Sequence, residues 1–127
     1  MEYSQIKDYK AQAVSSMSKG EQLVLLYDEA LKNLRYSCLM LEKENLETFF
    51  KCTKKSKDVF TYLLSILNFN YDLSDNLFQL YTYFNEQIIH AEVEKNSEPI
   101  KTIIPMVSEL KDAWIQADKE LHKNKKN

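Results

Sequence analysis

Few residues in this chain have the type and spacing that chemistry requires. The nearest approach to a metal motif is the segment Gln87 to His90, which has the Glu-x-x-His spacing of di-iron helical bundles. Gln87 cannot supply the carboxylate that such a site needs. His90 could instead be a phosphotransfer histidine, but none of the residues around it looks arranged to assist phosphoryl transfer. The pattern therefore favours a partly exposed histidine on the surface of the bundle or at the boundary between its surface and its core.

The remaining reactive side chains form no recognisable site. Cys38 and Cys52 lack a Cys-x-x-Cys spacing or a His partner, so we interpret both as free thiols that fill apolar space in a reducing cytoplasm. Gly20 stands alone and cannot make a loop that cradles phosphate. A group of neighbouring lysines indicates a solvated helix face rather than an anion site: Lys51, Lys54, Lys55 and Lys57. The sequence predicts no enzyme, no cofactor and no metal.

Composition places the chain in the all-α class. Its 127 residues include one Gly and two Pro, so the turns that a multi-strand β fold requires are scarce. A net charge of −2 argues against a nucleic-acid partner, which usually requires a strong basic excess. The N-terminus lacks the apolar core of a signal sequence, and no apolar run reaches the roughly 18 residues of a membrane span. We expect a soluble cytoplasmic protein of one domain, 1–127, with no membrane insertion.

Apolar residues recur at helical spacing along most of the chain. A weakly amphipathic segment covers Tyr3 to Ser15, and the first long helix is predicted from about Lys19 to Lys43. Ser18 and Glu21 have the spacing of a capping box at the start of this helix. Its apolar stripe consists of Leu23, Leu26, Tyr27, Ala30, Leu31 and Leu34.

Two further helices follow after short breaks. Asn45 is the predicted N-cap of the second helix, which ends at Asn68 or Asn70. Ser74 is the predicted cap of the third, which ends near Lys95. Long helices joined by short loops pack antiparallel, so together with a fourth helix they predict an up-down-up-down four-helix bundle.

The fourth helix has two possible starts. Ser97 with Pro99 favours the earlier one, because proline lacks the N–H that a first turn leaves unpaired. Pro105 would then lie inside the helix, so either the helix is kinked or it begins nearer 103–105. The basic end of the chain is predicted to be frayed. The expected division of the chain has three parts: an N-terminal segment, 1–16, the bundle, 19–122, and the frayed tail, 123–127.

Several helices carry a second apolar set out of phase with the core stripe. A bundle helix needs about three apolar positions in seven to face its core, and eight Tyr and six Phe are many for a bundle this small. Two interpretations stay open: an apolar groove that receives an amphipathic helix, or a wide core face with scattered surface residues. The out-of-phase residues are Leu25, Tyr36, Leu39, Met40, Tyr62, Ile66, Phe69, Phe78, Tyr83 and Ile89.

Four segments, taken together and in order, resemble the FliS family of flagellar export chaperones over nearly the whole chain. The first is the N-terminal segment, with Ile6, Tyr9 and Val14. The run SKGEQLVLLYDEAL is similar to the family's Ser-x-x-Glu-Leu followed by Leu-Tyr-Asp. The run LYTYFNEQIIHAE resembles its Leu-Tyr-x-Tyr and following Ala, and LKDAW resembles its Leu-Arg-x-Ala-Trp ending.

The chain also departs from the family pattern. A charge at Glu29 replaces a small residue, often Gly, and changes how closely another helix can approach. The other departures are Lys19 for a common Pro, Glu92 for a frequent Asn and Lys111 for the usual Arg.

The resemblance implies a non-enzymatic cytoplasmic chaperone, built as an antiparallel four-helix bundle with a short N-terminal helical cap. Such proteins bind the disordered C-terminal segment of flagellin, which becomes helical, and so prevent premature polymerisation and keep it export-competent. By this resemblance, Ile6, Tyr9 and Val14 belong to the cap that flagellin displaces. The resemblance assigns five bundle residues to flagellin binding: Leu23, Tyr27, Leu31, Tyr81 and Phe84.

Two other functions stay open at this stage. One is a phosphotransfer bundle that uses His90, and the other is a structural helical protein that self-associates through its surplus apolar residues. The chaperone interpretation implies a monomer or weak dimer, with flagellin as its client and other flagellar export or regulatory proteins as further partners.

Overall fold

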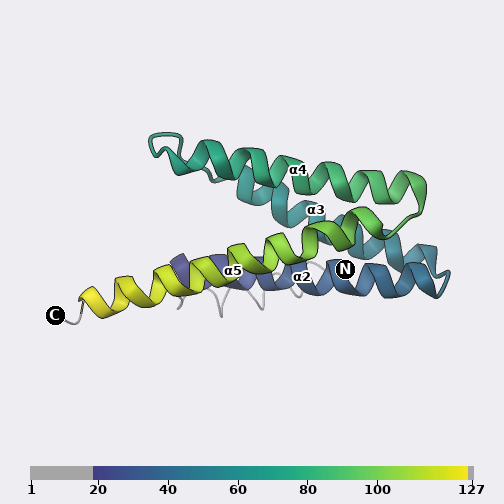
Figure 1. Ribbon diagram of the computed structural model, residues 1–127, viewed down its shortest axis with the longest axis horizontal. Helices are drawn as coiled ribbons and strands as arrows, with labels where there is room; N and C mark the ends of the chain where they lie inside the picture. The colour runs from purple at the N-terminus through teal and green to yellow at the C-terminus, as the bar shows by residue number, and fades with distance from the viewer. Residues whose placement is uncertain (1–18, 126–127) are drawn as a thin grey trace, which may run out of the picture.

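The computed structural model describes residues 19–125, with side chains up to residue 121. Within this range the chain forms four helices and no strand, as Figure 1 shows, and the all-α prediction is confirmed. The cap residues and Ser18 of the predicted capping box lie outside the described residues. The helices are α2 (Lys19–Glu42), α3 (Leu46–Ser65), α4 (Leu73–Glu94) and α5 (Glu98–Lys125).

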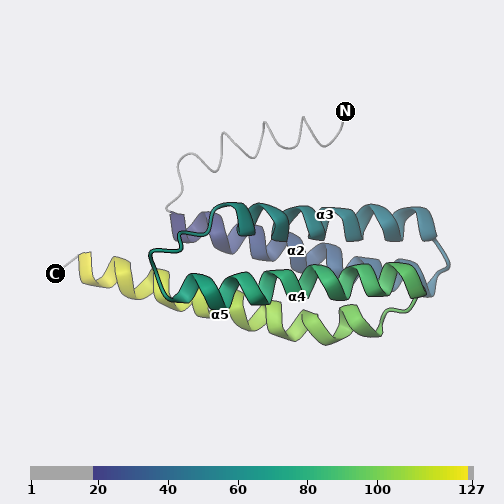
Figure 2. The ribbon, with the colours of Figure 1, turned by 90° about the horizontal axis from the view of Figure 1, so that it is seen from above.

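The helices form an antiparallel bundle in which each one packs against the next along the chain. α5 returns beside α2 and closes the bundle. Figures 1 and 2 show the connecting loops at the two ends, and the C-terminal end of α5 running past its neighbours. None of the helices between residues 19 and 125 combines the length and apolar content needed to cross a membrane.

The core consists of one apolar stripe from each helix. On α2, Tyr27, Ala30, Leu31 and Leu34 are fully buried, as their spacing predicts. Met40, which we expected out of phase with this stripe, is only 5% exposed and also belongs to the core. Each fully buried large apolar side chain contributes about 1.5–3 kcal/mol to folding, so these stripes supply most of the force that holds the helices together.

Asn45 caps α3 as predicted. Its side-chain oxygen accepts a hydrogen bond from the backbone N–H of Thr48 at 3.2 Å. This bond satisfies one of the N–H groups that the first turn of a helix leaves without a partner.

The loop between α3 and α4 differs from the prediction at both of its ends. α3 ends at Ser65, before the predicted Asn68 or Asn70, because Asn68 accepts hydrogen bonds inside the loop instead of continuing the helix. Its carbonyl accepts from Tyr71 N at 3.2 Å and its side chain from Asn70 N at 3.0 Å. The prediction that Ser74 caps α4 is wrong. Ser74 lies in the first turn, and its hydroxyl donates to the Asn68 carbonyl at 2.5 Å.

α5 takes the earlier of its two possible starts. Pro99 lies in its first turn, and the helix continues through Pro105 to Lys125. Pro105 is exposed, and the carbonyl of Lys101 receives no N–H donor from position 105, because proline has none. The helix extends into 123–127, the segment that we expected to be frayed.

Candidate functional site

Three aromatic side chains form a hydrogen-bonded chain through the interior of the bundle. The hydroxyl groups of Tyr27 on α2 and Tyr81 on α4 share a hydrogen bond. Trp114 on α5 donates its indole N–H to the Tyr27 hydroxyl at 2.9 Å. Because buried polar groups cost stability when they lose a partner, these bonds favour one relative arrangement of the three helices.

Burial controls the ionisation of the two tyrosines. It raises the pKa of Tyr27, and the hydrogen bonds with Tyr81 and Trp114 partly oppose that rise. Burial also raises the pKa of Tyr81, and the hydrogen bond with Tyr27 adds to the effect. Both hydroxyls are therefore neutral near pH 7 and serve as hydrogen-bonding groups within the core.

Most of the bundle residues predicted to bind flagellin lie in this core. Four of them have exposed fractions of 0 to 2%: Tyr27, Leu31, Tyr81 and Phe84. Leu23 is half-buried and packs against the core from its edge. Ile6, Tyr9 and Val14 lie outside the described residues. The four buried side chains offer almost no surface to a partner in this structure and instead hold the helices together.

A groove of about 450 Å³ lies between the N-terminal half of α2 and the C-terminal half of α5. Its apolar lining comes from Val24 and Leu25 on α2 and Ile115 on α5, all half-buried. Charged side chains of both signs line the same groove: Glu21, Asp28, Lys111, Asp118 and Lys119. This combination suits an amphipathic helix, which presents apolar residues on one face and polar residues beside them.

An ion pair joins α2 and α5 at this groove. The Nζ atom of Lys111 lies 3.3 Å from Oδ1 of Asp28, and the two side chains are 25% and 44% exposed. Lys111 stands where the family commonly has arginine. A lysine bonds a carboxylate as a point charge, whereas arginine can bond both oxygens in parallel. Lys111 therefore joins the two helices through a single charged contact with Asp28.

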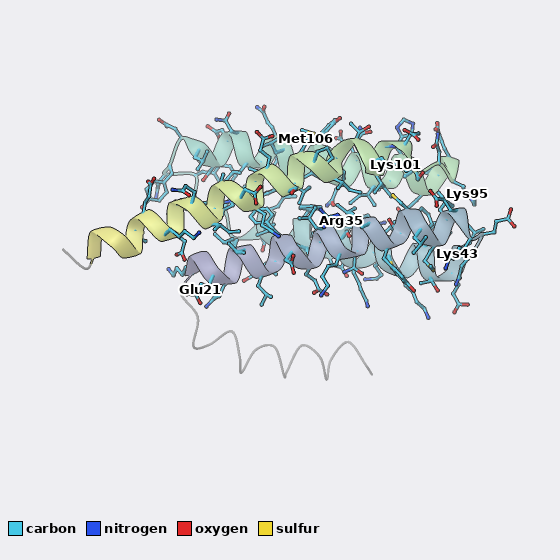
Figure 3. The ribbon with its side chains drawn as sticks, turned by 60° about the horizontal axis from the view of Figure 1, so that its bottom comes forward. Glu21, Arg35, Lys43, Lys95, Lys101 and Met106 are labelled. Atoms are coloured by element: carbon cyan, nitrogen blue, oxygen red, sulfur yellow. The ribbon has the colours of Figure 1, made fainter. Side chains whose placement is uncertain are left out.

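Gly20 lies against the Asp118 side chain of α5 at the end of the same groove. A Cβ atom at this position would lie 2.2 Å from Oδ1 and 2.7 Å from Cγ of Asp118. Any other residue would therefore force the Asp118 side chain to move. Figure 3 shows α5 alongside α2, with Glu21 at the start of α2. Because the carboxylate ends a flexible side chain, this contact does not fix the separation of the two helices.

Glu29 lies away from this groove. It is half-buried and lines a separate depression of about 580 Å³ on the face of α2. The other residues of this depression also come from α2: Lys32, Asn33, Arg35, Tyr36 and Leu39. Glu29 does not line the groove shared with α5. Its charge would instead meet a partner that approached this face of α2.

Glu92, another departure from the family pattern, links α4 to α3. Its two carboxylate oxygens accept hydrogen bonds from Lys57 at 2.7 Å and from the Thr53 hydroxyl at 2.6 Å. The Glu92 side chain is 13% exposed and that of Lys57 is 28% exposed. Lys57 thus departs from the solvated face predicted for it, because this partly buried pair holds it between helices.

The other candidate reactive groups have ordinary surroundings. Nε2 of the exposed His90 lies 3.1 Å from Oε1 of Glu94. Cys38 and Cys52 are buried and free, and burial raises the pKa of both thiols, which keeps them protonated and poorly nucleophilic. Among the described side chains, no group of three or more His, Cys, Asp or Glu residues could hold a metal ion.

Comparison with known proteins identifies the family. The family profile described as "Flagellar protein FliS" matches residues 2–121. The chain belongs to the FliS family. It is 25% identical to the flagellar secretion chaperone FliS of Bacillus subtilis over 109 residues, which cover 86% of this chain and 82% of that protein. It is also 25% identical over 111 residues to the flagellar secretion chaperone FliS of Vibrio cholerae serotype O1, with the same coverage.

Three of the four segments that resemble the FliS family meet inside the bundle. Tyr27 belongs to the Leu-Tyr-Asp segment, Tyr81 to Leu-Tyr-x-Tyr, and Trp114 ends LKDAW. Their side chains form the hydrogen-bonded chain described above. Sequence reasoning missed these hydrogen bonds, although each of the three aromatic residues has a polar atom and a core position in its helix. The protein is a flagellar export chaperone of the helical-bundle type, and these FliS segments stabilise its fold.

Proposed function

We propose that this chain binds the disordered C-terminal segment of flagellin in the cytoplasm, without catalysis, and thereby prevents premature polymerisation and keeps flagellin export-competent. Membership of the FliS family supports a client in flagellar export. The observation that carries the proposal is the groove between α2 and α5, whose apolar lining suits one face of a client helix. The free energy gained by burying apolar surface must exceed the entropic cost of ordering a disordered segment.

The N-terminal cap belongs to the same proposal. Val14 precedes the first residue of α2 by only a few positions, and the groove begins at this end of α2. A cap that contains Ile6, Tyr9 and Val14 is therefore within reach of the groove, and we propose that flagellin displaces it. Leu23 at the edge of the core is the bundle residue from the predicted set with surface left for such a contact.

The test measures binding of a labelled peptide from the flagellin C-terminus to the full chain. Ile115→Asp removes apolar lining from the groove and puts a carboxylate there that a docked client would cut off from water, so it is expected to weaken binding at least about tenfold. Ile89→Asp is the matched control, since Ile89 is 47% exposed on α4, outside the groove. This variant should bind like the unmodified chain.

A second arm uses co-purification with flagellin that has or lacks its C-terminal segment. The chain should retain only the flagellin that has the segment. Equal binding by Ile115→Asp and Ile89→Asp, with both variants folded by circular dichroism, would reject the groove as the site. Retention of the truncated flagellin would reject the C-terminal segment as the client.

A further inference from the structure

Exposed apolar side chains concentrate where α3 passes into α4. Of the thirteen exposed large apolar residues between 19 and 121, six fall within residues 62–78, and each is 47 to 67% exposed. Scattered single apolar residues are normal on a protein surface, whereas such a concentration marks an interaction site. We name this set the tip: Tyr62, Ile66, Phe69, Tyr71, Leu73 and Phe78.

The loop at the centre of the tip has a defined conformation. The Asn68 carbonyl accepts from Tyr71 N at 3.2 Å and from the Ser74 hydroxyl at 2.5 Å. The rings of Phe69 and Phe78 pack edge to face, with their centroids 6.1 Å apart. These contacts hold the aromatic side chains in position while leaving them exposed to solvent.

The stretch of chain that contains the tip carries charged residues of one sign. No Lys or Arg occurs from Asp58 to Glu94, whereas this stretch contains six acidic residues. Asp72 and Asp75 lie between residues of the tip along the chain, and both are exposed. Figures 1 and 3 place three basic residues toward the opposite end of the molecule from the loop between α3 and α4: Lys43, Lys95 and Lys101.

We propose that the tip is a docking surface for a basic amphipathic segment of a partner protein, a helix with apolar residues on one face and Lys or Arg beside them. The six tip residues supply apolar surface, and Asp72 and Asp75 supply charge complementary to the partner. A second copy of this chain would bring like charges together, and an anionic membrane surface would repel the acidic tip. The tip is separate from the groove between α2 and α5, so the two sites can be tested independently.

The binding test uses the full chain and a defined probe. The probe is a fluorescein-labelled helical peptide of about 14 residues, or four turns, made of Leu and Lys. A peptide of the same pattern with Glu in place of Lys is the charge control, and it is expected to bind at least about tenfold more weakly. Added salt is expected to weaken binding of the Leu-Lys peptide, because it screens exposed charges.

Two pairs of substitutions locate the site. The double variant Phe69→Gln with Phe78→Gln is expected to bind the Leu-Lys peptide about tenfold or more weakly. It lacks two exposed aromatic rings that docking would bury. Tyr36→Gln with Leu39→Gln is the matched control. These two residues are 48% and 42% exposed on α2, and they line a depression that also contains two cations. The control variant should bind the probe like the unmodified chain, and circular dichroism checks that both variants fold.

Several results would overturn the proposal. One is equal probe affinity in the two double variants. Competition by the flagellin peptide would show one shared site, and a dimer that the tip substitutions dissociate in sedimentation would make a second copy the occupant. Stronger probe binding after deletion of residues 1–15 would make the chain's own N-terminal segment the occupant.

Discussion

At the scale of single residues, the hydroxyl group of Tyr27 joins three helices. It takes part in two hydrogen bonds, one with Trp114 and one with Tyr81, whereas the Tyr81 hydroxyl takes part in one. The two tyrosines differ in this respect although both are buried. A phenylalanine at either position keeps the ring and its packing and removes only the hydroxyl group, so the two positions can be compared directly.

We expect Tyr27→Phe to lower the free energy of unfolding by about 1–3 kcal/mol, because it leaves the Trp114 N–H and the Tyr81 hydroxyl without their shared partner. Tyr81→Phe should have a smaller effect, since the bond between Trp114 and Tyr27 remains. Urea unfolding followed by circular dichroism measures both values.

Tyr36→Phe is the control for this comparison. Tyr36 is 48% exposed, and an exposed substitution of this kind changes stability by less than about 0.5 kcal/mol. If Tyr81→Phe proved as destabilising as Tyr27→Phe, Tyr27 would not be the central residue of these hydrogen bonds.

At the scale of elements, α5 keeps its helical path through a proline. Pro105 lies well inside the helix, where a proline removes one backbone hydrogen bond and crowds the preceding turn. Its exposed position lets water reach the carbonyl of Lys101. Packing of α5 against α2 and α4 therefore maintains a helix that its local sequence opposes.

We expect Pro105→Ala to raise the free energy of unfolding by about 1–3 kcal/mol, because alanine restores the N–H donor to the Lys101 carbonyl. Pro99→Ala is the control, since Pro99 lies in the first turn of α5, where no intrahelical bond is lost. Its effect should stay below about 1 kcal/mol. Thermal and urea unfolding measure both variants, and a loss of stability in Pro105→Ala would mean that the proline shapes α5 for its packing.

The sequence predicted the number, order and approximate bounds of these helices because periodicity and capping are local signals. Asn45 is an example, since its N-cap role depends on Thr48 only three residues away. Ser74 is the counterexample. Its hydroxyl bonds the Asn68 carbonyl across the loop, and that bond requires a loop conformation that propensities do not specify.

The candidate site was harder to predict for a related reason. Periodicity identifies an apolar face, but it does not say whether that face meets the core or a partner. Tyr27 and Tyr81 resembled groove residues because of their family segments, and both are buried. Leu25 was out of phase with the core stripe, and it does line the groove with Ile115. That groove depends on how α5 lies against α2, which only the tertiary structure provides.

At the scale of the whole molecule, the proposed cap makes a prediction about exposed apolar surface. Deletion of residues 1–15 removes Ile6, Tyr9 and Val14, so we expect increased ANS fluorescence from the groove between α2 and α5 and tighter binding of the flagellin peptide. Deletion of 123–127, which removes only polar residues from the other end of the chain, is the control and should change neither value.

Sedimentation of the shortened protein completes this experiment. If sedimentation gives the same oligomeric state before and after the deletion, the extra ANS signal does not come from a dissociated dimer. No increase in fluorescence after deletion of 1–15 would reject the cap, and a stable dimer that ignores the flagellin peptide would favour a self-associating structural protein.

The one-sided charge of the α3–α4 region also determines how a protease divides the molecule. Trypsin cleaves after Lys and Arg, and the chain has neither between Lys57 and Lys95. All of α4, the end of α3 and the loop between them are therefore released as the single peptide Asp58–Lys95, which contains the whole tip. In a tryptic map, a crosslink to any tip residue would appear as one change in mass on one fragment, whereas the other helices are cut into several pieces.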